Sequence, residues 1–207
     1  MFTNGVPLAK NDDKNDFKSL KLTHRNDSDS SESSETIYVN RQDNGDDHKH
    51  LSKRAAFTTD QRKFQNDMLY AHNYYRSYYC AQALQLDDTL SRSAQNFAEK
   101  LAYANQFYHS GTQGVGENLY MASGMTINGY TAVISWYKEI QKYNFNSGGF
   151  SMATGHFTQL VWKSTTRVGV GVAYGNGGRS VYVVAQYTPP GNVIGQFQAN
   201  VRPQGSC

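Results

Sequence analysis

The chain has 207 residues with 20 basic and 17 acidic side chains, and its Lys and Arg residues form no cluster, which argues against a nucleic-acid-binding protein. It contains no run of about 18 apolar residues, so the sequence predicts no transmembrane helix. Cys80 and Cys207 are the two cysteines, far fewer than a disulfide-rich secreted scaffold has, and the sequence leaves open whether they pair or stay free thiols.

Composition divides the chain at Ala55. Residues 1–54 hold ten acidic and nine basic side chains but only three of the 27 aromatic residues, and the stretch "NDSDSSESSET" has no helix or strand period. The sequence therefore predicts a disordered polar tail or pro-segment over 1–54, dispensable for folding, and a folded domain over 55–207. The pair Lys53-Arg54 is where a processing protease would cut, although the start "MFTNGVPLAK" lacks the apolar core of a signal peptide.

Three helical stretches are predicted first within the domain. The segment "TTDQ" (58–61) has the form of a capping box, and apolar side chains then recur every three or four residues, which predicts a helix to about Tyr79. A second helix is predicted after Asp88 with a stripe that ends at Leu101, and a third from about Thr126 with Trp136 on its apolar face. The apolar face of the first helix consists of Phe64, Met68, His72 and Tyr75.

A β-hairpin is predicted at the end of the domain. The stretch "RVGVGVAYGNGGRSVYVVAQY" (167–187) alternates small and β-branched residues around a glycine-rich turn. Helices followed by a hairpin predict an α+β fold in which the helices are layered on a short antiparallel sheet. Gly169 and Gly171 leave one face of the first strand bare, either because a helix backbone comes close, which we favour, or to make room beside a site.

Few residues of the domain could carry chemistry. Its three histidines are His72, His109 and His156, and His72 on a helical apolar stripe reads as a core histidine with satisfied hydrogen bonds. His156 opens "GHFTQLVWKST" among large apolar side chains, so its imidazole needs polar partners, of which His109, Glu117 and Glu139 are the available ones. Glu139 also reads as an ordinary surface glutamate. The glycines of "GTQGVGENL" make a poor phosphate loop because no helix follows them.

Four short motifs resemble those of the CAP superfamily, which unites cysteine-rich secretory proteins, antigen 5 and plant pathogenesis-related proteins. They are "HNYYR", "GENL", "GHFTQLVWKST" and "YVVAQYTPPGNV", in the family's order, and the resemblance extends from Ala55 to about Pro203. The stretch "YNFNSGGFSMATGHFTQLVWKSTTRVGVG" is most similar to the Golgi-associated branch. Ala185 stands where the second signature usually has cysteine, a departure which that branch shares.

The resemblance implies a three-layer α-β-α sandwich with a His-Glu-Glu-His tetrad in a central cleft. Carried over motif by motif, the tetrad is His109, Glu117, Glu139 and His156. Two neutral imidazoles oriented by carboxylates are able to hold Zn²⁺ or another divalent cation, so His109 and His156 are the expected metal ligands.

The resemblance favours a non-enzymatic protein that binds a lipid or sterol, a membrane surface or another protein, with a homodimer as a further expectation and no nucleic acid as partner. One alternative is a metal-dependent hydrolase or protease in which Glu117 or Glu139 serves as general base. Another is a secreted defence or venom-type effector that acts through surface loops. An extracellular location is expected, with a cytoplasmic or Golgi-membrane location as the alternative.

Overall fold

The computed structural model describes residues 56–206, so the expectations for the polar tail, Ala55 and Cys207 lie outside the described residues. None of the described helices is both long and apolar enough to cross a bilayer. The elements in chain order are α1 (Thr59–Arg76), η1 (Ser77–Tyr79), β1 (Gln85–Leu86), α2 (Asp88–Ala104), β2 (Gly116–Ser123), α3 (Gly129–Tyr137), η2 (Lys138–Lys142), α4 (Gly155–Leu160), β3 (Arg167–Gly175), η3 (Asn176–Gly178), β4 (Ser180–Thr188) and α5 (Phe197–Asn200).

Helix α1 begins and buries its apolar face as the sequence predicts. The Thr58 side chain accepts a hydrogen bond from the Gln61 backbone N–H, and the Gln61 side chain accepts one from the Thr58 N–H, which completes the capping box. Phe64, Met68, His72 and Tyr75 are all buried. The helix passes into the 3₁₀ turn η1, so helical structure continues to Tyr79 as expected.

The four strands form one sheet in the order β1-β3-β4-β2. The predicted hairpin is β3 and β4, paired antiparallel, and β4 also pairs antiparallel with β2. The two-residue strand β1 pairs parallel with β3, so the sheet is mixed rather than purely antiparallel. Strand β2 was not predicted, and its residues include the "GENL" motif.

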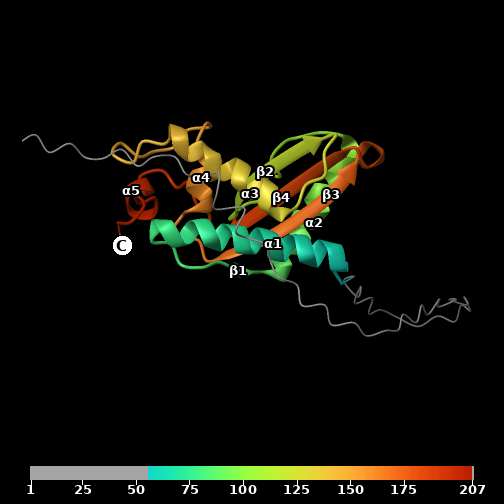
Figure 1. The fold of residues 1–207 in the computed structure, drawn as a ribbon, viewed down its shortest axis with the longest axis horizontal. Coiled ribbons are helices and arrows are strands. Elements are labelled where there is room, and N and C mark those ends of the chain that lie inside the picture. Colours follow the sequence, from blue (N-terminus) through green and yellow to red (C-terminus); the bar gives the residue numbers. More distant parts are fainter. Residues whose placement is uncertain (1–55, 207) are drawn as a thin grey trace, which may run out of the picture. The chain divides into compact units, whose positions relative to one another are not determined.

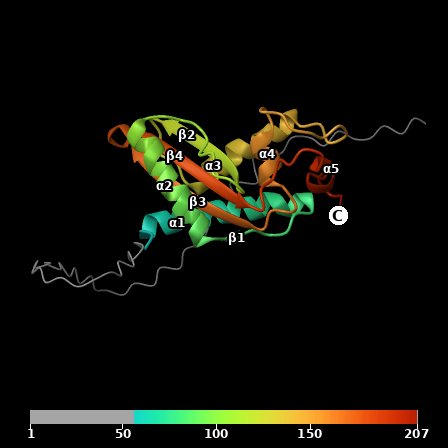
Figure 2. The ribbon, with the colours of Figure 1, turned by 180° about the vertical axis from the view of Figure 1, so that it is seen from behind.

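Helices cover both faces of this sheet, which gives the α-β-α layers of the expected fold. Helix α2 lies over β3 and β4, in front of the sheet in Figure 2, while α1 and α3 pack together on the other face, in front in Figure 1. The bare strand face lies under α2: a Cβ on Gly169 would be 2.2 Å from the Leu90 carbonyl carbon, and one on Gly171 would be 2.3 Å from that of Ala94. The close helix approach predicted for these glycines is confirmed.

Helix α3 begins at Gly129, after the N-cap Asn128, a few residues later than expected. Val133 and Trp136 of this helix are buried, and the Trp136 indole N–H donates to the Leu119 carbonyl of β2 over 3.0 Å. Trp136 therefore fastens α3 to the outer strand of the sheet. The 3₁₀ turn η2 follows directly and carries Glu139.

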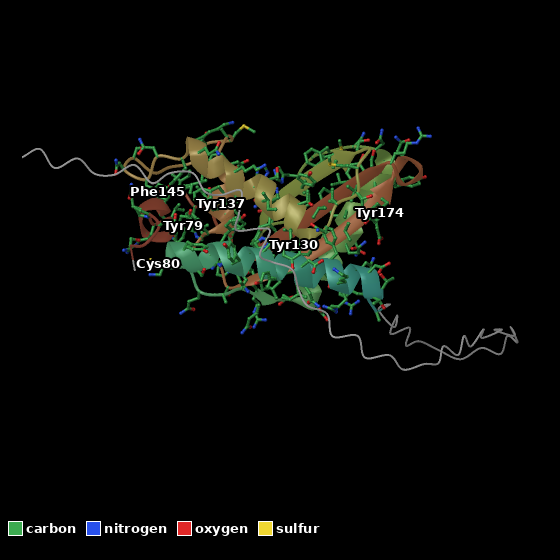
Figure 3. The ribbon with its side chains drawn as sticks, viewed as in Figure 1. Tyr79, Cys80, Tyr130, Tyr137, Phe145 and Tyr174 are labelled. Carbon is green, nitrogen blue, oxygen red and sulfur yellow. The ribbon has the colours of Figure 1, made fainter. Side chains whose placement is uncertain are left out.

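A cluster of aromatic rings joins α1, α3 and α4. The Tyr75 and Tyr137 rings stack at 3.8 Å, the Tyr79 and Tyr137 hydroxyls are 2.9 Å apart, and the Phe157 ring of α4 contacts Tyr79 and Phe145. Tyr79, Tyr137 and Phe145 gather at one end of the domain in Figure 3. Part of the domain's aromatic residues thus packs the helices together.

Cys80 follows η1 and is disulfide-bonded. Its sulfur also lies 3.5 Å from the Ser206 hydroxyl, near the C-terminal end of the chain. The sequence has one other cysteine, Cys207, which lies outside the described residues.

Candidate functional site

The first pair of the expected tetrad joins His109 and Glu117. The His109 ring nitrogen Nδ1 lies 2.9 Å from Glu117 Oε1, and the same oxygen accepts the Ser110 backbone N–H over 2.8 Å. The other carboxylate oxygen, Oε2, accepts from the Gln186 amide over 3.1 Å. Glu117 is 7% exposed at its side chain and His109 63%, so a buried carboxylate holds an imidazole that reaches solvent.

The electrostatics of this pair stabilise the ionised form of each partner. The hydrogen bond to Glu117 raises the pKa of His109 above its ordinary value, although partial burial opposes this shift. Burial by itself would raise the pKa of Glu117, but the hydrogen bonds from His109, Ser110 and Gln186 outweigh it and lower that pKa.

The second pair joins His156 and Glu139 across two elements. His156 Nδ1 lies 2.6 Å from Glu139 Oε1, while Glu139 Oε2 accepts the backbone N–H groups of His156 and Phe157 over 2.9 and 3.1 Å. Thr154, the N-cap of α4, makes no capping bond with its side chain, so the Glu139 carboxylate takes that role from η2. Glu139 is therefore a structured partner of His156 rather than a free surface glutamate.

Asn118 of β2 connects the two pairs. It follows Glu117 directly in the strand, and its side-chain amide donates to the His156 carbonyl oxygen over 3.1 Å. The start of β2 also passes close to α4, because a Cβ on Gly116 would lie 2.0 Å from the Gln159 side-chain oxygen. All four tetrad residues are thus tied to the first residues of β2, His109 and Glu117 directly and Glu139 and His156 through α4.

His72 lies behind the tetrad and is fully buried. Its Nδ1 lies 2.7 Å from the Met68 carbonyl and its Nε2 lies 2.8 Å from the Tyr187 hydroxyl. Burial lowers the pKa of His72 to about 4, against a raising effect of the Met68 carbonyl. The interpretation of His72 as a core histidine with satisfied hydrogen bonds is confirmed.

Acid is expected to weaken the fold through His72. The pKa of His72 in the folded chain lies below the unfolded value of 6.5. As the pH falls, His72 therefore binds a proton in the unfolded chain before it does in the folded chain. The stability that neutral His72 contributes is complete above that unfolded value and disappears as the pH falls to about 4, a loss of about 3 kcal/mol.

The neutral variant His72→Gln isolates this effect from other titrating groups. The difference in free energy of unfolding between the wild type and His72→Gln should shrink by about 3 kcal/mol between pH 7 and pH 4 in urea titrations. A difference that stays constant over this range would show that His72 is not the group that titrates.

The donor set of the tetrad suits a divalent cation in one respect. Each imidazole turns Nδ1 toward a carboxylate, which leaves Nε2 for a ligand, as in the carboxylate–histidine pairs that metal sites use. Among residues 56–206, no group of three or more His, Cys, Asp or Glu side chains is placed to hold a metal ion. A cation at Nε2 of His109 and His156 would therefore take its other ligands from water or a bound molecule.

Two loops beside His156 expose apolar side chains. We call Phe150, Met152, Val193 and Ile194 the loop patch; Met152 is 89% and Ile194 78% exposed. The loops meet at Gly155, whose carbonyl accepts the Asn192 amide over 2.9 Å and whose Cβ position lies 3.1 Å from the Phe150 ring. The loop patch thus lies on the segments next to the α4 turn that carries His156.

Sequence reasoning found the tetrad and His72 but missed Asn118, Tyr187 and Gln186. The available signal was polar groups in strand segments rich in apolar residues: Asn118 follows Glu117 in "ENL" of β2, and Gln186 and Tyr187 are adjacent in "AQY" of β4. Such residues need hydrogen-bond partners, and here the partners lie in the site.

Comparison with known proteins agrees with this fold. Residues 69–187 match the cysteine-rich secretory protein family, CAP. The human Golgi-associated plant pathogenesis-related protein 1 is 44% identical over 147 residues, which cover 69% of this chain and 94% of that protein. Pathogenesis-related protein 1C of Nicotiana tabacum is 40% identical over 136 residues, 64% of this chain and 79% of that protein.

A crystal structure of NaASP2 with Zn²⁺ has the same fold. It superposes with a TM-score of 0.59 at 21% identity and covers 73% of this chain and 91% of the NaASP2 chain. The motifs, the layered fold, the family match and the identity to its relatives lead to one conclusion: the chain belongs to the cysteine-rich secretory protein (CAP) family.

Proposed function

We propose that this protein is a non-enzymatic binding protein that takes an apolar ligand of the lipid or sterol class at the loop patch. The observation that carries the proposal is the exposure of four apolar side chains on two loops joined at Gly155. Apolar side chains gathered on neighbouring surface segments are typical of a binding site, because their burial by a ligand is favourable.

The tetrad supports binding rather than catalysis. Every carboxylate oxygen of Glu117 and Glu139 already accepts a hydrogen bond that orients an imidazole, an α4 backbone group or Gln186. Carboxylates that hold imidazoles and backbone groups in this way act as outer partners that orient a binding site. The alternative of a metal-dependent hydrolase thus has no specific observation in its favour.

A cation would belong to the same region. His109 and His156 would hold Zn²⁺ or another divalent ion through Nε2, and such an ion would polarise a group of the bound molecule. The two carboxylates hold the rings through Nδ1, which leaves Nε2 for such an ion. An extracellular location is part of the proposal, and a mature chain that starts at Ala55 in culture medium would support it.

Binding of radiolabelled cholesterol and of radiolabelled palmitate to the full-length chain tests the function. The double variant Phe150→Ser/Ile194→Ser should bind at least tenfold more weakly, since two side chains half buried by the ligand contribute about 1.5 to 3 kcal/mol together, and about 1.4 kcal/mol is tenfold.

Tyr103→Ser is the matched control, because Tyr103 is 96% exposed on α2, the helix on the other face of the sheet from α1 and α3. It should bind like the wild type. Saturable binding that is equal in all three proteins would move the site elsewhere, and a wild type that binds neither lipid would contradict the function.

A further inference from the structure

Three hydrogen bonds hold His156: one at its ring, one at its backbone N–H and one at its carbonyl oxygen. Glu139 fixes the ring through Nδ1 and fixes the backbone through the His156 N–H. Asn118 fixes the other side of the residue, because its amide donates to the His156 carbonyl over 3.1 Å. The imidazole therefore has its orientation set from η2 and its distance from β2 set by Asn118.

A line of buried hydrogen bonds holds Asn118 in turn. Asn118 is 1% exposed, and its amide nitrogen also lies 3.3 Å from the hydroxyl of Tyr187, which is fully buried in β4. That hydroxyl lies 2.8 Å from His72 Nε2.

In this chain of hydrogen bonds, each group determines whether the next one donates or accepts. The Met68 carbonyl can only accept, so His72 carries its proton on Nδ1 and accepts at Nε2. Tyr187 must then donate to His72 and accept from Asn118, which leaves the second Asn118 N–H for the His156 carbonyl. One proton arrangement satisfies all four groups, so the Asn118 amide cannot turn over without breaking bonds.

We propose that Asn118, locked by Tyr187 and His72, is the positioning residue that sets the spacing between the two imidazole–carboxylate pairs. Glu117 and Asn118 are neighbours on β2, and successive side chains of a strand point to opposite faces. Glu117 bonds the His109 ring and Asn118 bonds the His156 backbone carbonyl, so two adjacent residues of one strand anchor the two pairs relative to each other. This inference deepens the proposed site and rests on the proposed function only for its Zn²⁺ readout.

Tyr187→Phe in the full-length chain tests the proposal, with Tyr182→Phe as the matched control. Both tyrosines are buried in β4 and both variants remove a hydrogen-bonded hydroxyl: that of Tyr187 bonds His72 and Asn118, and that of Tyr182 donates to the Asn105 side chain over 2.8 Å. Nitrogen NMR of the histidine rings reports the state of His156 without any metal. Calorimetric titration with Zn²⁺ alone gives the metal affinity, which depends on the spacing between the His109 and His156 rings.

The His156 ring signals should shift and broaden in Tyr187→Phe and stay unchanged in Tyr182→Phe. The Zn²⁺ affinity should fall about tenfold in Tyr187→Phe, at the lower end of what the loss of an outer partner does to a metal site. Asn118→Ala should weaken it at least as much, and serves in place of Tyr187→Phe if that variant does not fold.

If the wild type binds no Zn²⁺, the metal part of the proposed function fails, while the ring signals still test the role of Asn118. Identical His156 signals in Tyr187→Phe and Tyr182→Phe would overturn the positioning role.

Discussion

Replacing Arg76 with methionine should lower the free energy of unfolding by about 3 to 5 kcal/mol. Arg76 is fully buried at the end of α1, and its guanidinium donates to four backbone carbonyls, those of Gln82, Leu160, Trp162 and Thr165, over 2.8 to 3.0 Å. Methionine fills much of the space but leaves these acceptors without the donor. A buried acceptor left without a partner costs about 1 to 3 kcal/mol.

Removal of the charge offsets part of that loss. Burial lowers the pKa of Arg76 to about 10, which measures how unfavourable the charged form is in this place, and relief of this penalty returns about 3 kcal/mol. The four lost hydrogen bonds outweigh it. Leu160 ends α4, so the variant should also disturb the helix that carries His156.

Arg62→Met on the same helix is the control for Arg76→Met. Arg62 pairs with Asp88 at 2.8 Å, but both side chains are more than a third exposed, and such surface pairs contribute less than about 1 kcal/mol. Urea unfolding of both variants gives the comparison through the shift in midpoint at constant slope. Equal losses of free energy of unfolding in the two variants would show that the buried hydrogen bonds of Arg76 stabilise the fold no more than the surface ion pair of Arg62 does.

Gly171→Ala should strongly destabilise the protein, although it adds a single methyl group to the sheet. The added Cβ would lie 2.3 Å from the Ala94 carbonyl carbon and 2.3 Å from the Gln95 nitrogen, both backbone atoms of α2. A helix backbone cannot rotate away as a side chain can, so α2 must move off β3. We expect a loss of about 3 kcal/mol, at the upper end of the usual effect of overpacking.

Gly155→Ala provides the matching control for Gly171→Ala. Its nearest neighbour would be the Phe150 ring at 3.1 Å, the end of an exposed side chain that can shift. Gly155 is the first residue of α4, where helix propensity has less weight than in a helix interior, so the net change should be within about 1 kcal/mol of zero. Thermal unfolding of the two proteins decides the point, and a Gly171→Ala variant as stable as Gly155→Ala would contradict the close packing of α2 on β3.

The helices and the hairpin could be predicted because their signals are local. The capping box at Thr58 and the alternation in β3 and β4 involve residues a few positions apart, and both gave the observed elements. Strand β2 escaped prediction because its partner, β4, lies far along the chain, with Glu117 opposite Gln186. A strand whose first residues serve a site instead of a core does not show a clear period of two.

The candidate site likewise contains residues that the sequence indicates and residues whose role it does not indicate. Scarcity of histidine and glutamate, together with the family motifs, pointed to the tetrad residues before their contacts were known. Asn118 and Tyr187 lie within the family motifs, but the motifs do not indicate their role, because it depends on four groups from α1, β2, α4 and β4 that meet only in the folded chain. Hydrogen bonds between distant segments are a property of the tertiary structure, and no local pattern encodes them.

Calorimetric titration of the full-length chain with Zn²⁺ tests most directly whether the two imidazole–carboxylate pairs form one site. The wild type should bind one ion per chain, and His109→Ala and His156→Ala should each weaken binding more than tenfold, because each removes one of two protein ligands. Equal affinity in all three proteins would contradict a shared site, and would mean that His109 and His156 serve the fold through their carboxylate hydrogen bonds.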